Sequence, residues 1–124
     1  MAFHILVVDD DADVRDMLTR FLRRRGYVVD QAADGEEALR SLRNHDPDLM
    51  LLDIYLPKKT GLEVLHEMND AGLRIRTIAL SAMPDDQIIA NSLSLGAVSF
   101  LAKPFDFMEL TAQIDCNLVA SLDV

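Results

Sequence analysis

Cysteine, glycine and proline are scarce in this chain of 124 residues, which contains one, five and four of them respectively. The single Cys116 cannot form an internal disulfide bond, which is typical of proteins in a reducing compartment. No Gly/Ser/Pro-rich linker divides the chain. A chain of this length buries about two thirds of its unfolded surface and needs no disulfide bond or structural metal. We therefore expect a single domain over residues 1–124.

Basic residues are fewer than acidic ones, and the chain contains no long hydrophobic run. There are 12 lysines and arginines against 21 acidic residues, a formal net charge of −9. Both nucleic acids and anionic membrane surfaces attract positive charge, so the balance argues against direct binding to either. The longest uncharged stretch, residues 87–102, is short and interrupted by polar residues. We expect no transmembrane helix, no signal peptide and a cytoplasmic location.

Two hydrophobic periodicities alternate along the chain. Short aliphatic runs, several of them apolar nearly throughout, are typical of strands buried on both faces of a parallel sheet. The segments between them repeat apolar residues every three or four positions, as amphipathic helices do. In four of these segments an acidic or hydroxyl residue stands where a helix is capped. The predicted strands are 4–8, 27–32, 48–52, 75–80 and 97–102; the predicted caps are Asp34 with Glu37, Thr60 with Glu63, Asp85 or Asp86, and Asp106 with Glu109; Met17, Met50, Met68 and Met108 fall in the apolar pattern and are expected in the core.

Five strands that alternate with helices predict an α/β protein with a parallel sheet covered on both faces. The chain is too short for a closed eight-stranded barrel, so an open, doubly wound sheet is favoured. We predict a (βα)₅ flavodoxin-like fold with strand order 2-1-3-4-5.

Chemically active side chains follow four of the predicted strands. Asp9 and Asp10 follow the first, Asp53 the third, Ser81 the fourth and Lys103 the fifth. In the predicted strand order, the carboxyl ends of these strands lie at one edge of the sheet, where ligands bind in such folds. Three carboxylates, a hydroxyl and an ammonium group are therefore expected to meet there.

This combination of groups indicates phosphoryl chemistry assisted by a metal ion. Carboxylates about 4 Å apart repel one another unless a cation offsets their charge. Carboxylate oxygens without histidine or cysteine favour Mg²⁺, which completes its shell with water and phosphate oxygens. Lys103 and Ser81 supply a positive charge and a hydroxyl donor for a phosphoryl group. Asp53, at the centre of the sheet, is the best candidate for a covalent nucleophile.

Six motifs follow one another along the chain: ILVVDDD at 5–11, PDLMLLDIYLP at 47–57, GLEVL at 61–65, ALSA at 79–82, GA at 96–97 and FLAKPF at 100–105. In this order and spacing they resemble the receiver domain of two-component response regulators, over essentially the whole chain. The resemblance implies a signalling switch that promotes its own phosphorylation and dephosphorylation, and not a conventional turnover enzyme.

The resemblance also implies a role for each residue of the site. Asp53 would accept a phosphoryl group from a phosphohistidine on a sensor histidine kinase or histidine phosphotransfer protein. Asp10, Asp53 and the backbone carbonyl of Tyr55 would ligate Mg²⁺, with Asp9 acting largely through a bound water. Lys103 would contact the Asp53 carboxylate and then the phosphoryl oxygens.

Ser81 and Phe100 would form the switch. The resemblance implies that Ser81 moves to hydrogen-bond the phosphoryl group and that Phe100 swings into the space this leaves. The face made by the fourth helix, fifth strand and fifth helix would then act on an output domain, a downstream protein or a second copy of the chain. The Lys103–Pro104 bond resembles the family's cis peptide.

Tyr55 and Met83, each two residues beyond a site residue, depart from the family's pattern. Neither offers a carboxylate or amide to orient the water that hydrolyses an acyl phosphate, and both are bulky. We hypothesise a slow intrinsic dephosphorylation.

Two alternative functions of the chain remain open, and so do two explanations of a cluster of arginines. The chain could be a receiver-like interaction module that works without phosphorylation, although such a module has no need of the full acidic and basic set. A haloacid-dehalogenase-type phosphatase also begins with Asp-x-Asp, but here Asp13 stands where threonine or valine is expected. The arginines Arg20, Arg23, Arg24 and Arg25 could compensate the helix dipole or dock to an acidic kinase surface.

Overall fold

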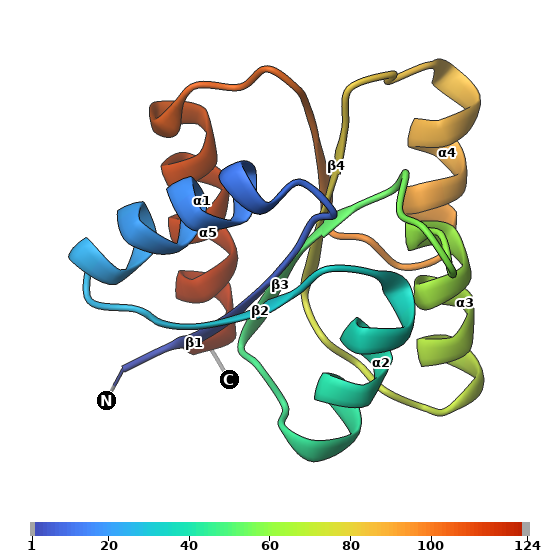
Figure 1. Ribbon diagram of the computed structural model, residues 1–124, viewed down its shortest axis with the longest axis horizontal. Helices are drawn as coiled ribbons and strands as arrows, with labels where there is room; N and C mark the ends of the chain where they lie inside the picture. The colour runs from blue at the N-terminus through green and yellow to red at the C-terminus, as the bar shows by residue number, and fades with distance from the viewer. Residues whose placement is uncertain (1, 123–124) are drawn as a thin grey trace.

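Five parallel strands form the centre of the molecule in the order β2-β1-β3-β4-β5, as the computed structural model shows (Figure 1). The structure describes residues 2–122, with side chains described for residues 2–118. The predicted strand order and alternation of strands with helices are confirmed. The elements are β1 His4–Val8, α1 Ala12–Arg24, β2 Val28–Ala32, α2 Gly35–Asn44, β3 Leu49–Asp53, α3 Gly61–Asp70, β4 Thr77–Ser81, α4 Asp86–Ser94, β5 Ser99–Ala102 and α5 Phe107–Leu122.

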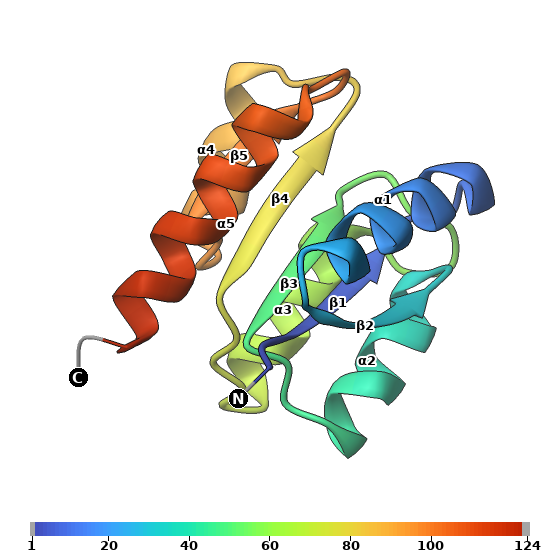
Figure 2. The ribbon, with the colours of Figure 1, turned by 90° about the vertical axis from the view of Figure 1, so that its left-hand side faces the viewer.

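The helices cover the two faces of the sheet. Helices α1 and α5 lie on one face, and α2, α3 and α4 lie on the other (Figures 1 and 2). The two apolar cores follow the same division. Side chains of α1 and α5 pack on one set of alternate residues of β1, β3 and β4, and side chains of α2 and α3 pack on the other set, which points to the opposite face. All five residues of β3 are buried, as expected for the central strand.

Strand β1 has the predicted bounds, whereas the other four strands differ from the predicted ones by one or two residues at one or both ends. Asp53 and Ser81, expected just after their strands, are the last residues of β3 and β4, where they pair with Leu80 and Ala102. Strand β5 begins two residues later than predicted because the backbone of Ala97 still donates a hydrogen bond to α4. Apolar residues continue through such turns, so hydrophobicity alone does not mark where strand pairing begins.

The predicted capping residues begin their helices. The Thr60 side chain accepts from the Glu63 N–H while the Glu63 carboxylate accepts from the Thr60 N–H, a complete capping box. At α2, α4 and α5 an aspartate oxygen accepts a hydrogen bond from the backbone N–H three residues on. These aspartates are Asp34, Asp85 and Asp106, at 2.8, 2.8 and 2.7 Å.

Two of the four methionines expected in the core are outside it. Met50 and Met68 are buried, but Met17 is 46% exposed and Met108 is 83% exposed. Both exposed residues lie beside the inward stripe of their helix, which is occupied in α1 by Leu18 and Leu22 in place of Met17. The prediction for Met17 and Met108 was therefore wrong. None of the helices in residues 2–122 combines the length and the apolar character that a membrane span requires.

Candidate functional site

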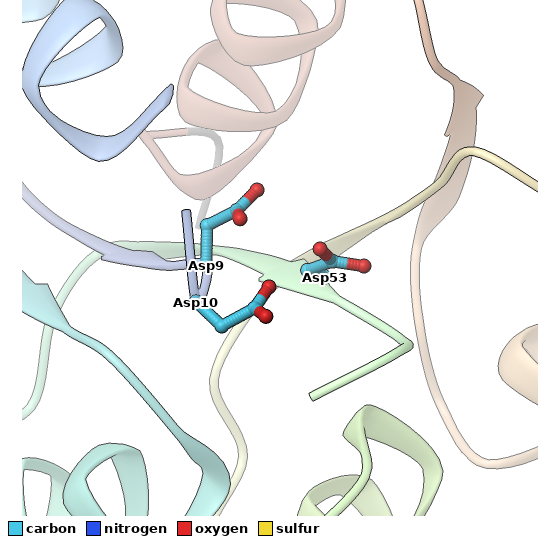
Figure 3. A group of neighbouring side chains, drawn as sticks. All are labelled: Asp9, Asp10 and Asp53. Atoms are coloured by element: carbon cyan, nitrogen blue, oxygen red, sulfur yellow. The ribbon is translucent and has the colours of Figure 1, made fainter. Parts of the chain in front are cut away.

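Three carboxylates converge at the carboxyl edge of the sheet (Figure 3). Asp9 and Asp10 follow β1, and Asp53 ends β3, the strand that pairs with β1. Each residue has one carboxylate oxygen in a set whose members all lie within 4.8 Å of one another. Asp9 is 1% exposed and Asp53 is 6% exposed, whereas Asp10 is open to solvent. The structure thus brings together the three carboxylates that the sequence placed at this edge.

Lys103 neutralises part of this negative charge. Its Nζ donates hydrogen bonds to Asp9 Oδ2 at 2.5 Å and to Asp53 Oδ2 at 3.0 Å. The residue directly follows β5, and β4 separates that strand from β3, so the long side chain reaches across one strand. The Lys103–Pro104 peptide bond is cis. The buried carboxylates therefore have a partner that charge balance requires.

Burial and the mutual hydrogen bond shift the pKa values of both members of this pair. It raises the pKa of the Asp53 carboxyl above its ordinary value, because desolvation penalises the charged form more than the hydrogen bond and charge of Lys103 favour it. Burial by itself lowers the pKa of Lys103, but the hydrogen bonds to Asp9 and Asp53 outweigh it and raise that pKa overall. Lys103 therefore carries its full charge at neutral pH.

Ser81 and Phe100 lie on the strands beyond Asp53. Ser81 is buried at the end of β4, and its Oγ accepts a hydrogen bond from the Met83 N–H at 3.0 Å. The Ser81 carbonyl accepts from the Lys103 N–H at 2.8 Å, which connects β4 to the lysine. Phe100 is half-buried on β5 and packs against the core under α2, α3 and α4. The hydroxyl group is thus next to the acidic cluster in the sheet, and Phe100 sits on the adjacent strand.

The loop after β3, residues 54–60, folds back tightly on Asp53. The Tyr55 N–H donates to Asp53 Oδ1 at 3.1 Å, and the Tyr55 side chain is 41% exposed. Gly61 closes the loop with an N–H bond to the Ile54 carbonyl at 2.8 Å. A Cβ at Gly61 would lie 2.6 Å from the Asp53 carbonyl oxygen, so only glycine fits there. This close approach holds the backbone at Asp53 and Ile54, directly after the Asp53 side chain.

The donor set fits a hard divalent cation. All three groups are carboxylates, which Mg²⁺ prefers, and one oxygen of each lies within reach of a single ion. Within residues 2–122, no hydrogen bond is made by the Asp10 carboxylate, so its lone pairs are available to a ligand. Asp9 and Asp53 each have one oxygen bound to Lys103 and another that accepts from a backbone N–H. Asp10 is therefore the carboxylate of the cluster with most freedom to bind.

Arg15, which the sequence analysis did not single out, also belongs to this neighbourhood. Its Nη1 donates to the backbone carbonyl of Asp9 at 2.6 Å, and its Nε donates to Gln31 Oε1 on β2 at 3.3 Å. The target is a main-chain oxygen, and no residue-type pattern in the sequence identifies such a contact. The sequence gives one indication that Arg15 lies close to the acidic cluster, namely its position one turn into the helix that follows Asp9, Asp10 and Asp11.

Comparison with known proteins identifies the family. The model of the response regulator receiver domain matches residues 5–115, and the chain belongs to that family. It is 40% identical over 110 residues to the transcriptional regulatory protein DltR of Streptococcus agalactiae, covering 89% of this chain and 49% of that protein. Identity to the alkaline phosphatase synthesis transcriptional regulatory protein PhoP of Bacillus subtilis is 38% over 114 residues, covering 92% and 48%. The chain spans about half the length of these curated relatives.

Solved structures show the same fold. The response regulator TrrA of Thermotoga maritima, determined in complex with Mg²⁺-BeF, has a TM-score of 0.83 and 34% identity, covering 94% of this chain and 99% of that one. A CheY-like receiver domain protein of Methanospirillum hungatei has a TM-score of 0.94 and 28% identity, covering 99% and 98%. The resemblance seen in the sequence motifs and the flavodoxin-like fold are both confirmed.

Proposed function

We propose that this chain is a phosphoacceptor switch in which Asp53 receives a phosphoryl group from a phosphohistidine, in a reaction that depends on Mg²⁺. The observation that carries the proposal is the buried Asp53 carboxylate, surrounded by two further carboxylates and the Lys103 ammonium. Neither an ion pair for stability nor a helix cap explains three carboxylates in one place, because their mutual repulsion costs free energy. Mg²⁺ bound to the related TrrA supports the choice of ion.

The ligands of the ion would be Asp10, Asp53 and the backbone carbonyl of Tyr55, with Asp9 held through water. When bound, Mg²⁺ offsets the charge of the carboxylates and of the incoming phosphoryl oxygens. A carboxylate oxygen of Asp53 forms a bond to phosphorus as the bond from phosphorus to the histidine nitrogen breaks, and the imidazole leaves with the electron pair. Lys103, already hydrogen-bonded to Asp53, is placed to contact a phosphoryl oxygen.

The switch would involve Ser81 and Phe100. The Ser81 Oγ accepts a hydrogen bond from the Met83 N–H, and its own O–H is the donor that would turn to the phosphoryl oxygens on Asp53. Phe100 is only half-buried, so an inward position would bury more apolar surface. The surface of α4, β5 and α5 would change with it and control an output domain or a downstream protein.

The proposed partners are a sensor histidine kinase or a histidine phosphotransfer protein as donor, and an output domain or downstream protein as receiver of the signal. Three of the four arginines at the end of α1 have local partners: Arg20 pairs with Asp16, Arg25 with Asp115, and Arg23 donates to the Val29 carbonyl. These contacts support a structural role for those arginines over docking to an acidic kinase.

A second copy of the chain is a further proposed partner of the phosphorylated form. Exposed apolar residues lie on the α4–β5–α5 surface, among them Leu93, Val98 and Met108. Sedimentation velocity before and after phosphorylation checks this. A larger species only after phosphorylation is expected, and an unchanged monomer would contradict it.

Intact mass after exposure to acetyl phosphate tests the function. We expect a gain of one phosphoryl group with Mg²⁺, none without it, and none in the Asp53→Asn variant. Binding of Mg²⁺ without any gain in mass would favour the alternative, an interaction module that works without phosphorylation. A protein that does not bind Mg²⁺ would contradict the proposed site altogether.

A further inference from the structure

Arg15 on α1 binds the peptide group that joins two residues of the acidic cluster. The carbonyl of Asp9 belongs to the Asp9–Asp10 peptide, and the 2.6 Å bond from Arg15 Nη1 is a short, charge-assisted one. The half-buried guanidinium is itself oriented by Gln31 on β2, which accepts from Nε at 3.3 Å. Arg15 thus connects α1, the end of β1 and β2.

The direction of that carbonyl restricts the direction in which the Cα–Cβ bond of Asp10 leaves the backbone. A peptide unit is planar, so fixing its C=O also fixes the N–H of Asp10 and limits the two dihedral angles on either side. On the other side of Asp9, the backbone N–H donates to the Ala32 carbonyl at 3.2 Å. The backbone that leads into Asp10 is therefore held at both of its peptide groups.

Asp10 depends on this backbone more than its two neighbours in the cluster do. The side chain of Asp9 accepts bonds from Lys103 and from the Asp11 N–H, and that of Asp53 accepts bonds from Lys103 and from the Tyr55 N–H. The Asp10 carboxylate makes no hydrogen bond within residues 2–122. Nevertheless it points toward Asp53 (Figure 3). Only the conformation of its own backbone remains to orient it.

We propose that Arg15 is a positioning residue that, through the Asp9 carbonyl, holds the Asp10 carboxylate in the geometry in which it binds the divalent cation. The proposal rests on the proposed function, because it assigns Arg15 to the same metal site. Prior orientation lowers the conformational cost of binding, as it does for groups that orient metal ligands elsewhere. Arg15 itself would not touch the ion.

The charge of Arg15 makes the proposal easy to distinguish from an electrostatic effect. A guanidinium beside three carboxylates repels a divalent cation, so removing it strengthens Mg²⁺ binding if charge alone matters. If Arg15 acts by positioning, removing it weakens Mg²⁺ binding in spite of the lost repulsion. The two explanations therefore predict opposite signs for one measurement.

Titration calorimetry of Mg²⁺ binding to Arg15→Gln and Arg15→Met, beside the wild type, tests the proposal. Both variants lack the Nη1 donor that reaches the carbonyl, and methionine keeps an apolar stem in place of the arginine methylenes. We expect Mg²⁺ affinity to fall roughly tenfold in both, the lower end of what such orienting groups contribute. The Mg²⁺ concentration for half-maximal phosphorylation by acetyl phosphate should rise equally, with the rate at saturating Mg²⁺ within about twofold of wild type.

Arg40→Gln, the same change at an exposed position of α2, is the matched control and should leave Mg²⁺ affinity unchanged. Unchanged or tighter binding in the Arg15 variants overturns the proposal, even if they unfold at a lower temperature, because a purely structural role would affect only stability. Should one variant fail to fold, the other decides the question. Wild-type protein that binds Mg²⁺ without being phosphorylated would contradict the proposed function. The calorimetric comparison of the Arg15 variants with wild type would still decide whether Arg15 positions Asp10.

Discussion

Asp53 is held in a buried, partly desolvated site where its charged form lowers the stability of the fold. Its pKa lies above the ordinary value because burial penalises the carboxylate form. The folded protein therefore binds that proton more tightly than the unfolded chain, and stability falls as pH rises from about 3.9 through the folded pKa. A destabilised group at a reactive position is common where function requires it.

Asp53→Asn should therefore stabilise the protein at neutral pH. The amide has nearly the same shape and carries no charge to desolvate, so we expect an increase of several degrees in Tm at pH 7.5, since about 1 kcal/mol corresponds to roughly 4 °C for a domain of this size. The gain should shrink as pH falls through the raised folded pKa toward about 3.9, below which aspartate is protonated in both states. Thermal unfolding from pH 4 to 8 checks this, with the exposed Asp46→Asn as control. A lower Tm for Asp53→Asn at pH 7.5 would refute it.

Tyr55 and Met83 would affect the lifetime of the phosphorylated state that we propose for Asp53. Both side chains are exposed, and neither carries a group that orients a water for attack on an acyl phosphate. We expect the double variant Tyr55→Asn, Met83→Glu to lose its phosphoryl group faster than wild type, by about tenfold, as a well-placed polar group contributes to water activation. Decay of the phosphorylated protein, followed by intact mass after removal of acetyl phosphate, measures this. Equal decay rates would remove the hypothesis of slow hydrolysis.

At the scale of elements, the loop between β3 and α3 is held by a glycine that touches the backbone of Asp53. In Gly61→Ala the new Cβ would lie 2.6 Å from the Asp53 carbonyl oxygen and 2.8 Å from the Ile54 Cα, which are backbone atoms that cannot rotate away. We expect the free energy of unfolding to fall by about 1–3 kcal/mol, as in other overpacked sites. Phosphorylation should slow as well, because the loop that carries Tyr55 must shift.

Gly72→Ala is the matched control for this prediction. A Cβ at Gly72 meets nothing within 4 Å, but its φ of +72° is one that alanine adopts only with strain. It should lower stability by about 1 kcal/mol and leave the phosphorylation rate unchanged. Urea unfolding and acetyl phosphate kinetics on both variants separate a general loss of stability from a displaced phosphoacceptor loop. Equal kinetic effects would show that the Gly61 contact has no special role.

The starts of four helices were predictable from their capping residues, whereas of the five strand starts only that of β1 was predicted correctly. An N-cap is a local interaction between a side chain and a backbone N–H two or three residues on, so Thr60 with Glu63 can be recognised in isolation. A strand is defined by hydrogen bonds to another segment. Ala97 and Val98 look like strand residues, yet the first bonds to α4 and only the second reaches β4, at the Thr77 carbonyl.

At the scale of the whole molecule, negative charge is in excess, and the acidic cluster adds local repulsion to it. A ligand that binds only the folded state stabilises it by mass action. At a Mg²⁺ concentration about 100 times Kd, we expect the free energy of unfolding to rise by about 2.7 kcal/mol. Thermal unfolding with MgCl₂, and with NaCl at matched ionic strength, measures the effect. Asp10→Asn should lose most of it, and an equal shift in NaCl would mean that general screening is responsible.

The sequence by itself determined the alternation of strands and helices, the strand order and the residues that would meet at one edge of the sheet. These follow from short-range periodicity, from the handedness of crossovers and from the fact that the carboxyl ends of parallel strands share an edge. Asp9, Asp10, Asp53, Ser81 and Lys103 could be assembled on that basis. The methionines could not be assigned in the same way, because the apolar stripe of α1 does not say which of Met17 and Leu18 faces the sheet.

Only the tertiary structure decided which atoms hold the site together. That Lys103 reaches across β4 to Asp53 and across β4 and β3 to Asp9 depends on strand spacing and side-chain rotamer, and residue type alone specifies neither. The bond from Arg15 to the Asp9 carbonyl has a backbone acceptor, and every residue has one of those. Contacts of this kind arise when segments distant in the chain pack against one another, so they become visible only in the folded molecule.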